Sequence, residues 1–256
     1  IVVSGLLVGL VLVLPAFWLE RQAQAWWSAI SPGTAHYFAG ALLPVQTAGD
    51  LILPAVGTFL VVALIEEGLR YLALLFWFKL SKKIDQVFDG LLVGVAAGLG
   101  FATLENTIYF FQLFSSGEFN TLVFVFFLRF VISTLAHISF GGIMGVLLTR
   151  GIFNIYRPRL IYVEAFLIPW FMHGLYDWLL GVNQTVYAVL LLLMPLAWLV
   201  AWTKRRQFLA HHRDRTGKIM LQEEAPRHAG VAKQRRPVDN PWNRQAPWIG
   251  AGAKRS

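Results

Sequence analysis

The feature that most constrains this chain is a succession of apolar runs, each long enough to cross the hydrocarbon core of a bilayer as a helix. Such a crossing takes about 20 residues. Six of these runs follow one another, over residues 1–19, 51–80, 88–114, 122–148, 160–180 and 186–202. Hydrophobic residues make up 57% of the 256 residues and charged residues only 14%, which excludes an ordinary soluble domain. The sequence therefore predicts an all-α, polytopic membrane helix bundle of about six transmembrane helices in residues 1–203.

The charges between the runs predict how the bundle is oriented. The connections after the second, fourth and sixth runs carry nine basic residues: Lys79, Lys82, Lys83, Arg150, Arg157, Arg159, Lys204, Arg205 and Arg206. The connections on the opposite side carry one, Arg21. Because Lys and Arg collect in cytoplasmic loops, we expect a multi-pass plasma-membrane protein of bacterial type, with both termini cytoplasmic.

Residues 204–256 differ in composition from the rest of the chain. They hold 13 Lys or Arg residues against 4 Asp or Glu residues, whereas residues 1–203 hold 9 against 10. With little apolar periodicity, this segment is predicted to be a disordered cytoplasmic tail that lies against anionic lipid heads. We expect no nucleic-acid partner. The first run lacks the basic leader and cleavage site of a signal peptide, and the absence of cysteine excludes disulfides and thiol chemistry.

Ionisable side chains inside the apolar runs are the strongest sign of function. Each one costs about 2.5–3.5 kcal/mol to insert at the centre of a membrane helix. Four runs nevertheless contain them: Glu66, Glu67, Arg70, Glu105, Arg129, His137, His173 and Asp177. Such groups are expected to face the bundle interior or a wet cavity, so their number predicts a shared functional site.

The spacing of these residues places several of them on common helix faces. Arg70 lies four residues after Glu66 and three after Glu67, so either carboxylate can pair with it. His173 and Asp177 are four residues apart. Asp177 could hold the His173 ring in one tautomer, share a metal with it, or present a second group to a substrate. A simpler interpretation of the Glu–Arg cluster is a buried ion pair that fixes helix register.

Two classes of function use such a cluster. One is a proton- or ion-coupled transporter with a carboxylate/histidine relay. The other is intramembrane hydrolysis, in which Glu and His activate a water and stabilise an oxyanion. The absence of detectable internal repeats weighs against the transporter. The usual zinc-protease signature of two His flanking a Glu is absent, but Glu67, His137 and His173 could still hold zinc. A metal-free glutamate/histidine site is the alternative.

Gly90, Gly94 and Gly98 recur at four-residue spacing and form a smooth stripe on one helix face. Glu105 lies seven residues beyond Gly98 and returns to nearly the same face. The stripe predicts a close helix contact that brings Glu105 towards the helix of Glu66.

The order of these motifs resembles the PrsW family of membrane proteases. The resemblance covers residues 51–180, about half the chain, and is most specific around Glu105. It rests on Glu66-Glu67-x-x-Arg70, on Asp89-Gly90 leading to Gly100-Phe101-Ala102-x-x-Glu105-Asn106-x-x-Tyr109, on Arg129 and His137, and on His173-x-x-x-Asp177. The wider superfamily is similar to the CAAX-type prenyl-protein proteases and the bacteriocin-processing proteases. Two positions depart from the family pattern: Val93 replaces a common tyrosine and Asp177 a frequent asparagine.

The resemblance implies a protease that cuts a membrane-anchored protein, such as an anti-sigma factor, on the extracytoplasmic side. We expect Glu66 or Glu67 to activate the attacking water, with His137 completing that half of the site. His173 would polarise the scissile carbonyl or share a metal, and Asp177 would orient it. Glu105 is expected as a further ligand or a neighbouring partner. The residues expected to support the site are Arg70, Asp89, Asn106 and Arg129.

Overall fold

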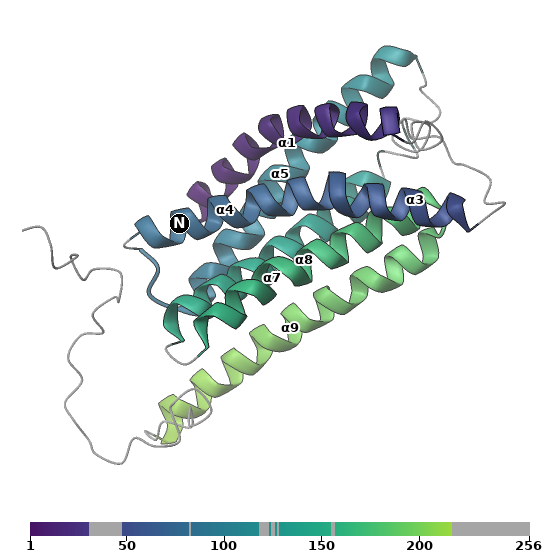
Figure 1. The fold of residues 1–256 in the computed structure, drawn as a ribbon. Helices are drawn as coiled ribbons and strands as arrows, with labels where there is room; N and C mark the ends of the chain where they lie inside the picture. The colour runs from purple at the N-terminus through teal and green to yellow at the C-terminus, as the bar shows by residue number, and fades with distance from the viewer. Residues whose placement is uncertain are drawn as a thin grey trace, which may run out of the picture. The chain divides into compact units, whose positions relative to one another are not determined.

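Every regular element of the described chain is a helix, which confirms the predicted all-α bundle. The computed structural model describes residues 1–30, 48–81, 83–117, 123, 126, 128–154 and 157–216. The elements are α1 (Val2–Ile30), α3 (Gly49–Gly57), η2 (Thr58–Ala63), α4 (Leu64–Leu80), α5 (Val87–Ser116), η3 (Leu128–Ser133), α7 (Thr134–Phe153), α8 (Pro158–Gly181) and α9 (Thr185–Thr216). Helix α5 packs between α1 and α7, and α7 packs against α8 (Figure 1).

The chain divides into two compact units, Ile1–Trp202 and Thr203–Ser256. The boundary falls within α9, whose helix continues through the Lys204–Arg206 run to Thr216. The tail was predicted to be disordered, but its first residues are helical, because Lys, Arg, Gln, Leu and Ala are all good helix formers. Residues 217–256, which include the rest of the predicted tail, lie outside the described residues.

Helix α1 is longer than its apolar run. It continues past Pro15 and Glu20 to Ile30, so residues 20–30, which follow the apolar run, are helical as well. Residues 31–47 lie outside the described part of the chain. The extension matters because it places a carboxyl group, that of Glu20, within the helical bundle.

Two π-helical segments lie just before site residues. The backbone runs without interruption from α3 through η2 into α4, since Gly57 and Leu64 at its edges keep right-handed helical dihedrals. Likewise, η3 leads directly into α7. Glu66 follows the end of η2 by three residues, and His137 follows the end of η3 by four. Such wide turns are frequent at functional sites, where they re-aim the side chains that follow.

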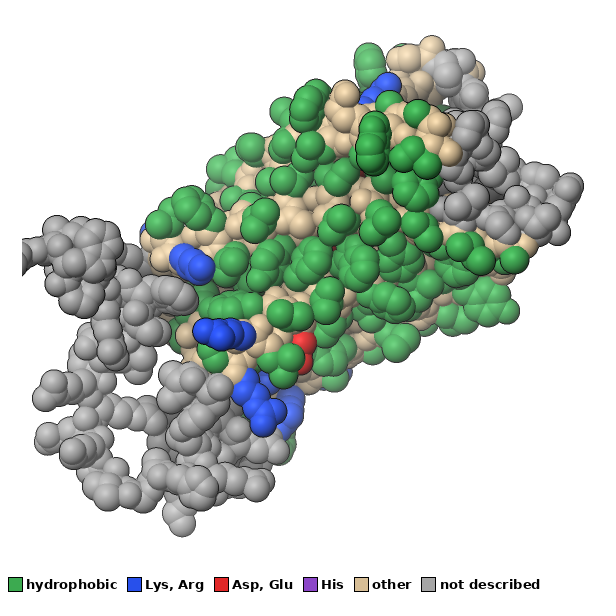
Figure 2. Space-filling view, in the orientation of Figure 1, with side chains coloured by type: hydrophobic (Ala, Val, Ile, Leu, Met, Phe, Trp, Pro, Cys, Tyr) green, Lys and Arg blue, Asp and Glu red, His purple; other side chains and the backbone are tan. Residues whose placement is uncertain are grey.

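Four helical segments are long and apolar enough to cross a membrane: Val2–Ile30, Val87–Ser115, Phe130–Phe153 and Thr185–Leu209. Hydrophobic side chains dominate the face shown in Figure 2, and most visible Lys and Arg side chains gather towards one end of it. The other two expected spans, α3–η2–α4 and α8, carry most of the ionisable site residues. These features confirm a membrane bundle, while the six passes and the cytoplasmic position of both termini stay predictions.

The glycine stripe lies against α7. A Cβ atom on Gly90, Gly94 or Gly98 would overlap a backbone carbonyl oxygen of α7, that of Gly145, Gly141 or His137 respectively. The two helix backbones are therefore in direct contact. We expected the stripe to bring α5 against the helix of Glu66 and Glu67, and this expectation was wrong. The stripe packs α5 against α7, the helix that carries His137.

A leucine at Gly94 is expected to lower the stability of the protein by at least about 3 kcal/mol, at or above the usual cost of overpacking. The cause is that the added side chain meets the rigid backbone of Gly141. Thermal unfolding in lipid would measure the loss. Gly68→Leu is the matched control, because a Cβ at Gly68 meets nothing within 4 Å. Equal stability of the two variants would show that the α5–α7 contact is looser than described.

Candidate functional site

Five buried polar side chains from three helices converge inside the bundle. Helix α4 supplies Glu66, Glu67 and Arg70, α7 supplies His137, and α8 supplies His173; each is at most 4% exposed. Two further carboxylates border this cluster and are more exposed, with side-chain exposures of 22% for Glu105 and 29% for Asp177. The structure thus brings together ionisable residues that the sequence places in four separate runs.

Glu67 lies at the centre of the buried charges. Its Oε1 accepts a hydrogen bond from Arg70 Nη1 and lies 2.8 Å from His173 Nδ1. The Arg70 guanidinium also stacks over the Phe101 ring, 4.7 Å from its centroid. A buried carboxylate is tolerated only when it is paired and hydrogen-bonded, so this arrangement compensates the charge of Glu67. Through these two contacts, Glu67 also holds the Arg70 and His173 side chains in place.

The neighbours of His137 determine its tautomer. Its Nδ1 lies 3.2 Å from Arg70 Nη2, and a guanidinium can only donate. Nδ1 is therefore the acceptor, and the neutral ring carries its hydrogen on Nε2, which lies 2.9 Å from Glu105 Oε2. Arg70 and Glu105 together hold the ring in one orientation between α4 and α5.

Carboxylate oxygens lie close to both ring nitrogens of His173. Besides the contact of its Nδ1 with Glu67, its Nε2 lies 3.1 Å from Asp177 Oδ2 and 3.9 Å from Glu66 Oε2. The Phe140 ring stacks on the imidazole with centroids 5.5 Å apart. Gly174, next in sequence, lets the Phe59 ring of η2 approach where a Cβ would collide with it. Packing and hydrogen bonds thus fix the position of His173.

One group in the described chain has the composition of a metal site. Glu66, His137 and His173 each offer a ligand atom, and these atoms all lie within 4.8 Å of one another. Glu66 Oε2 is buried without a hydrogen-bond partner among the described residues. Two imidazoles and one carboxylate match the three protein ligands of catalytic zinc sites. The donor set therefore fits zinc in its composition, with Glu66 in the position for which the sequence suggested Glu67. To bind the ion, His137 would give up either the contact of its Nδ1 with Arg70 or that of its Nε2 with Glu105.

The expected supporting residues have separate locations. Asp89 lies near the start of α5, where its Oδ2 accepts hydrogen bonds from the backbone N–H groups of Asp85 and Gln86. That is a helix cap about 24 Å along the helix from Glu105. Asn106 is buried and donates to Thr134 Oγ1, which joins α5 to α7. The Arg129 side chain lies outside the described residues.

Two contributors to the site were not expected from the sequence. Phe101 lies beneath Arg70 and has its ring centroid 5.3 Å from that of His137. Its presence in the Gly-Phe-Ala motif was the available signal. Glu20 of α1 lies within hydrogen-bonding reach of Glu66 and within electrostatic range of Glu105, His173 and Asp177. An acidic residue directly after an apolar run was its only sequence signal.

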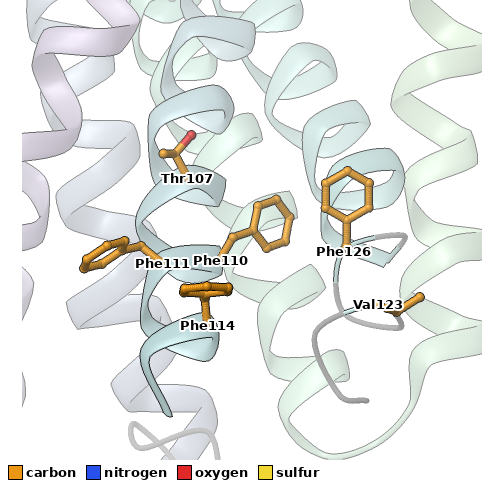
Figure 3. Close-up of a pocket in the computed structure, with 6 residues that line it drawn as sticks. All are labelled: Thr107, Phe110, Phe111, Phe114, Val123 and Phe126. Carbon is orange, nitrogen blue, oxygen red and sulfur yellow. The ribbon is translucent and has the colours of Figure 1, made fainter. Parts of the chain in front are cut away.

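An apolar pocket of about 510 Å³ lies further along α5, beyond Glu105. It is lined by Thr107, Phe110, Phe111, Phe114, Val123 and Phe126. Figure 3 shows the Phe110 ring directed towards the Phe126 ring, and their centroids are 4.9 Å apart. The pocket has an apolar lining without an ionisable residue, so it is suited to hydrocarbon and not to hydrolysis.

Comparison with known proteins shows which family the chain belongs to. The family described as PrsW family intramembrane metalloprotease matches residues 1–203. The chain belongs to the PrsW family. This membership supports assignment as an intramembrane protease, a hydrolase of peptide bonds in a membrane, and favours that class over a transporter.

Individual relatives lead to the same family. The chain is 31% identical over 159 residues to Protease PrsW of Geobacillus kaustophilus, a match covering 62% of this chain and 67% of the relative. It is 32% identical over 158 residues to Protease PrsW of Clostridioides difficile, covering 60% and 64%. For Protease PrsW of Bacillus subtilis the identity is 29% over 143 residues, covering 55% and 62%. The matches thus span about two thirds of each relative. No solved structure matches the chain.

Proposed function

We propose that this PrsW family member is a membrane endopeptidase that hydrolyses a peptide bond of a membrane-anchored protein, such as an anti-sigma factor. The observation that carries the proposal is the convergence of Glu66, His137 and His173, whose ligand atoms lie within 4.8 Å of one another inside an apolar bundle. A buried cluster of this kind is costly in a membrane and therefore indicates chemistry.

In this proposal, Glu66, His137 and His173 hold a zinc ion. When bound, such an ion acts as a Lewis acid that lowers the pKa of a water and polarises a carbonyl group. The chain's own residues prepare the site. Glu67 accepts from the Nδ1–H of His173, so Nε2, which also lies 3.1 Å from Asp177 Oδ2, would be the nitrogen that binds the ion. A carboxylate behind a ligand histidine is the usual means of fixing its tautomer.

Arg70 is assigned a structural and electrostatic role. It is fully buried, bonded to Glu67 and His137, and covered by Phe101. It therefore neutralises charge behind the site and does not reach a substrate. Glu105 and Asp177 are the more exposed members, so we place the approach of the scissile bond on their side of the cluster.

The substrate follows from the surroundings of the site. Because the bundle is embedded in lipid, a protein anchored in the same membrane reaches the cluster without leaving the bilayer. Extracytoplasmic cleavage and the contact of the basic tail with anionic lipid heads belong to the proposal. Reconstitution of the purified protein in lipid with candidate single-pass substrates is the direct test. A protein that cuts none of them, and instead moves protons or ions in response to a pH gradient, would be a transporter.

Metal removal is expected to abolish cleavage. Chelation of the purified protein should reduce the rate by at least about 10²-fold, the cost of losing one main electrostatic stabiliser, and added zinc should restore it. Elemental analysis before and after chelation checks that the ion has left. Full activity in metal-free protein would contradict the zinc site and would assign Glu66, with its unpartnered Oε2, as the general base.

A further inference from the structure

Helix α1 presents one continuous buried stripe to the bundle, and Glu20 extends it. The buried residues of α1 are Gly5, Gly9, Val13 and Ala16. Glu20 lies four residues after Ala16 and eleven after Gly9, so it returns to the same face at 3.6 residues per turn. Its carboxyl group therefore points towards the interior, although α1 is otherwise an apolar helix.

The position of this stripe is determined by backbone contact. A Cβ on Gly9 would overlap the carbonyl oxygen of Ala97 in α5, and one on Gly100 of α5 would overlap that of Leu6 in α1. Such contacts leave little freedom for α1 to rotate or slide. Helix α5 thus packs against α1 on one side and against α7 on the other (Figure 1). The location of Glu20 follows from this packing.

Glu66 is the site residue that lies next to Glu20. In the two turns of α1 before Glu20, Val13 and Ala16 pack in one apolar cluster with Ile65 and Leu69 of α4, which lie on either side of Glu66 in the chain. This packing brings the Glu20 carboxyl group within hydrogen-bonding reach of the Glu66 carboxyl group and within electrostatic range of Glu105, His173 and Asp177. Glu20 does not belong to the group of Glu66, His137 and His173 whose ligand atoms cluster within 4.8 Å. It therefore acts on the chemistry through Glu66.

We propose that Glu20 is a positioning residue of the site: it holds the Glu66 carboxyl group in place beside His137 and His173, and so makes α1 part of the catalytic centre. This inference rests on the proposed function for its effect on cleavage, while the contact between Glu20 and Glu66 is a separate property of the fold. Glu66 is otherwise poorly anchored, because its Oε2 has no partner among the described residues and lies 3.9 Å from Arg70.

The first test compares zinc affinity and cleavage rate among variants of the full-length protein in lipid. Glu20→Ala is expected to weaken zinc binding, measured against a competing chelator, and to slow cleavage, each by about 10- to 100-fold, the usual cost of losing an outer-shell partner. Glu20→Gln should recover most of both, since its amide can still donate to Glu66. Gln22→Ala, an exposed residue of the same helix, is the control expected to match wild type.

The second test needs neither metal nor substrate, so it separates this inference from the proposed function. Melting temperatures are measured for wild type, Glu20→Ala, Glu66→Ala and the double variant. The effect of Glu20→Ala is expected to differ by roughly 2–4 °C between the wild-type and the Glu66→Ala backgrounds, as for residues in direct contact. Additive effects would overturn the contact. Zinc affinity and cleavage in Glu20→Ala equal to those of Gln22→Ala would overturn the positioning role.

Discussion

A His173→Ala protein is expected to cleave its substrate about 10²- to 10⁴-fold more slowly than wild type, the usual cost of removing a catalytic base or electrostatic stabiliser. The His173 ring joins Glu67 on one side to Glu66 and Asp177 on the other, so its removal takes a candidate metal ligand out of the centre of the cluster. Single alanine variants of Glu66, Glu67 and His137 are expected to lose activity to a similar degree.

The measurement is the initial rate of substrate cleavage by purified variants in lipid, with thermal unfolding showing that each variant is folded. Leu167→Ala is a suitable control, because Leu167 lies on the same helix and is 44% exposed. It should retain wild-type activity. A folded His173→Ala protein that cleaves at the wild-type rate would remove His173 from the site and leave the metal group incomplete.

An Arg70→Leu protein is expected to be destabilised by about 3–5 kcal/mol, the cost of breaking a buried ion pair from one side. The loss arises because Glu67, which is fully buried, would keep its charge without the guanidinium that now bonds to it. The cation–π contact with Phe101 and the bond to His137 would be lost as well. Chemical or thermal unfolding in detergent or lipid measures the change.

A second substitution tests this explanation. Adding Glu67→Gln to Arg70→Leu removes the uncompensated charge, so the double variant is expected to be more stable than Arg70→Leu alone. Arg150→Leu serves as the control, since Arg150 is exposed at the end of α7 and should change stability by less than about 1 kcal/mol. An Arg70→Leu protein as stable as Arg150→Leu would mean that Glu67 is not charged in the folded protein.

The fold class and the membership of the cluster could be predicted from the sequence, for a physical reason. A bilayer leaves backbone groups no partner but each other, so an apolar run of sufficient length is helical wherever it stands. Ionisable groups inside such runs must find one another or water. Hence Glu66, Glu67, Arg70, His137 and His173 could be assigned to one site without knowledge of how the helices are arranged.

The separate roles of Glu66 and Glu67 could not be predicted from the sequence. Glu66 and Glu67 are adjacent and point about 100° apart, and both are at helical spacing from Arg70. Only the positions of α7 and α8 separate them. Glu67 faces Arg70 and His173 Nδ1, whereas Glu66 is left with His137 and His173 as the third member of a possible metal group.

Tertiary structure alone also decided what surrounds the cluster. The glycine stripe of α5 is visible in the sequence, but a smooth face can pack against any helix, and packing against α7 rather than α4 is what joins Glu105 to His137. Glu20 lies 46 positions before Glu66 in the chain. No local pattern connects the two, because their contact depends on the register of α1 against α5. The chemistry of the residues was therefore readable from the sequence, and their assignment to roles required the helix packing.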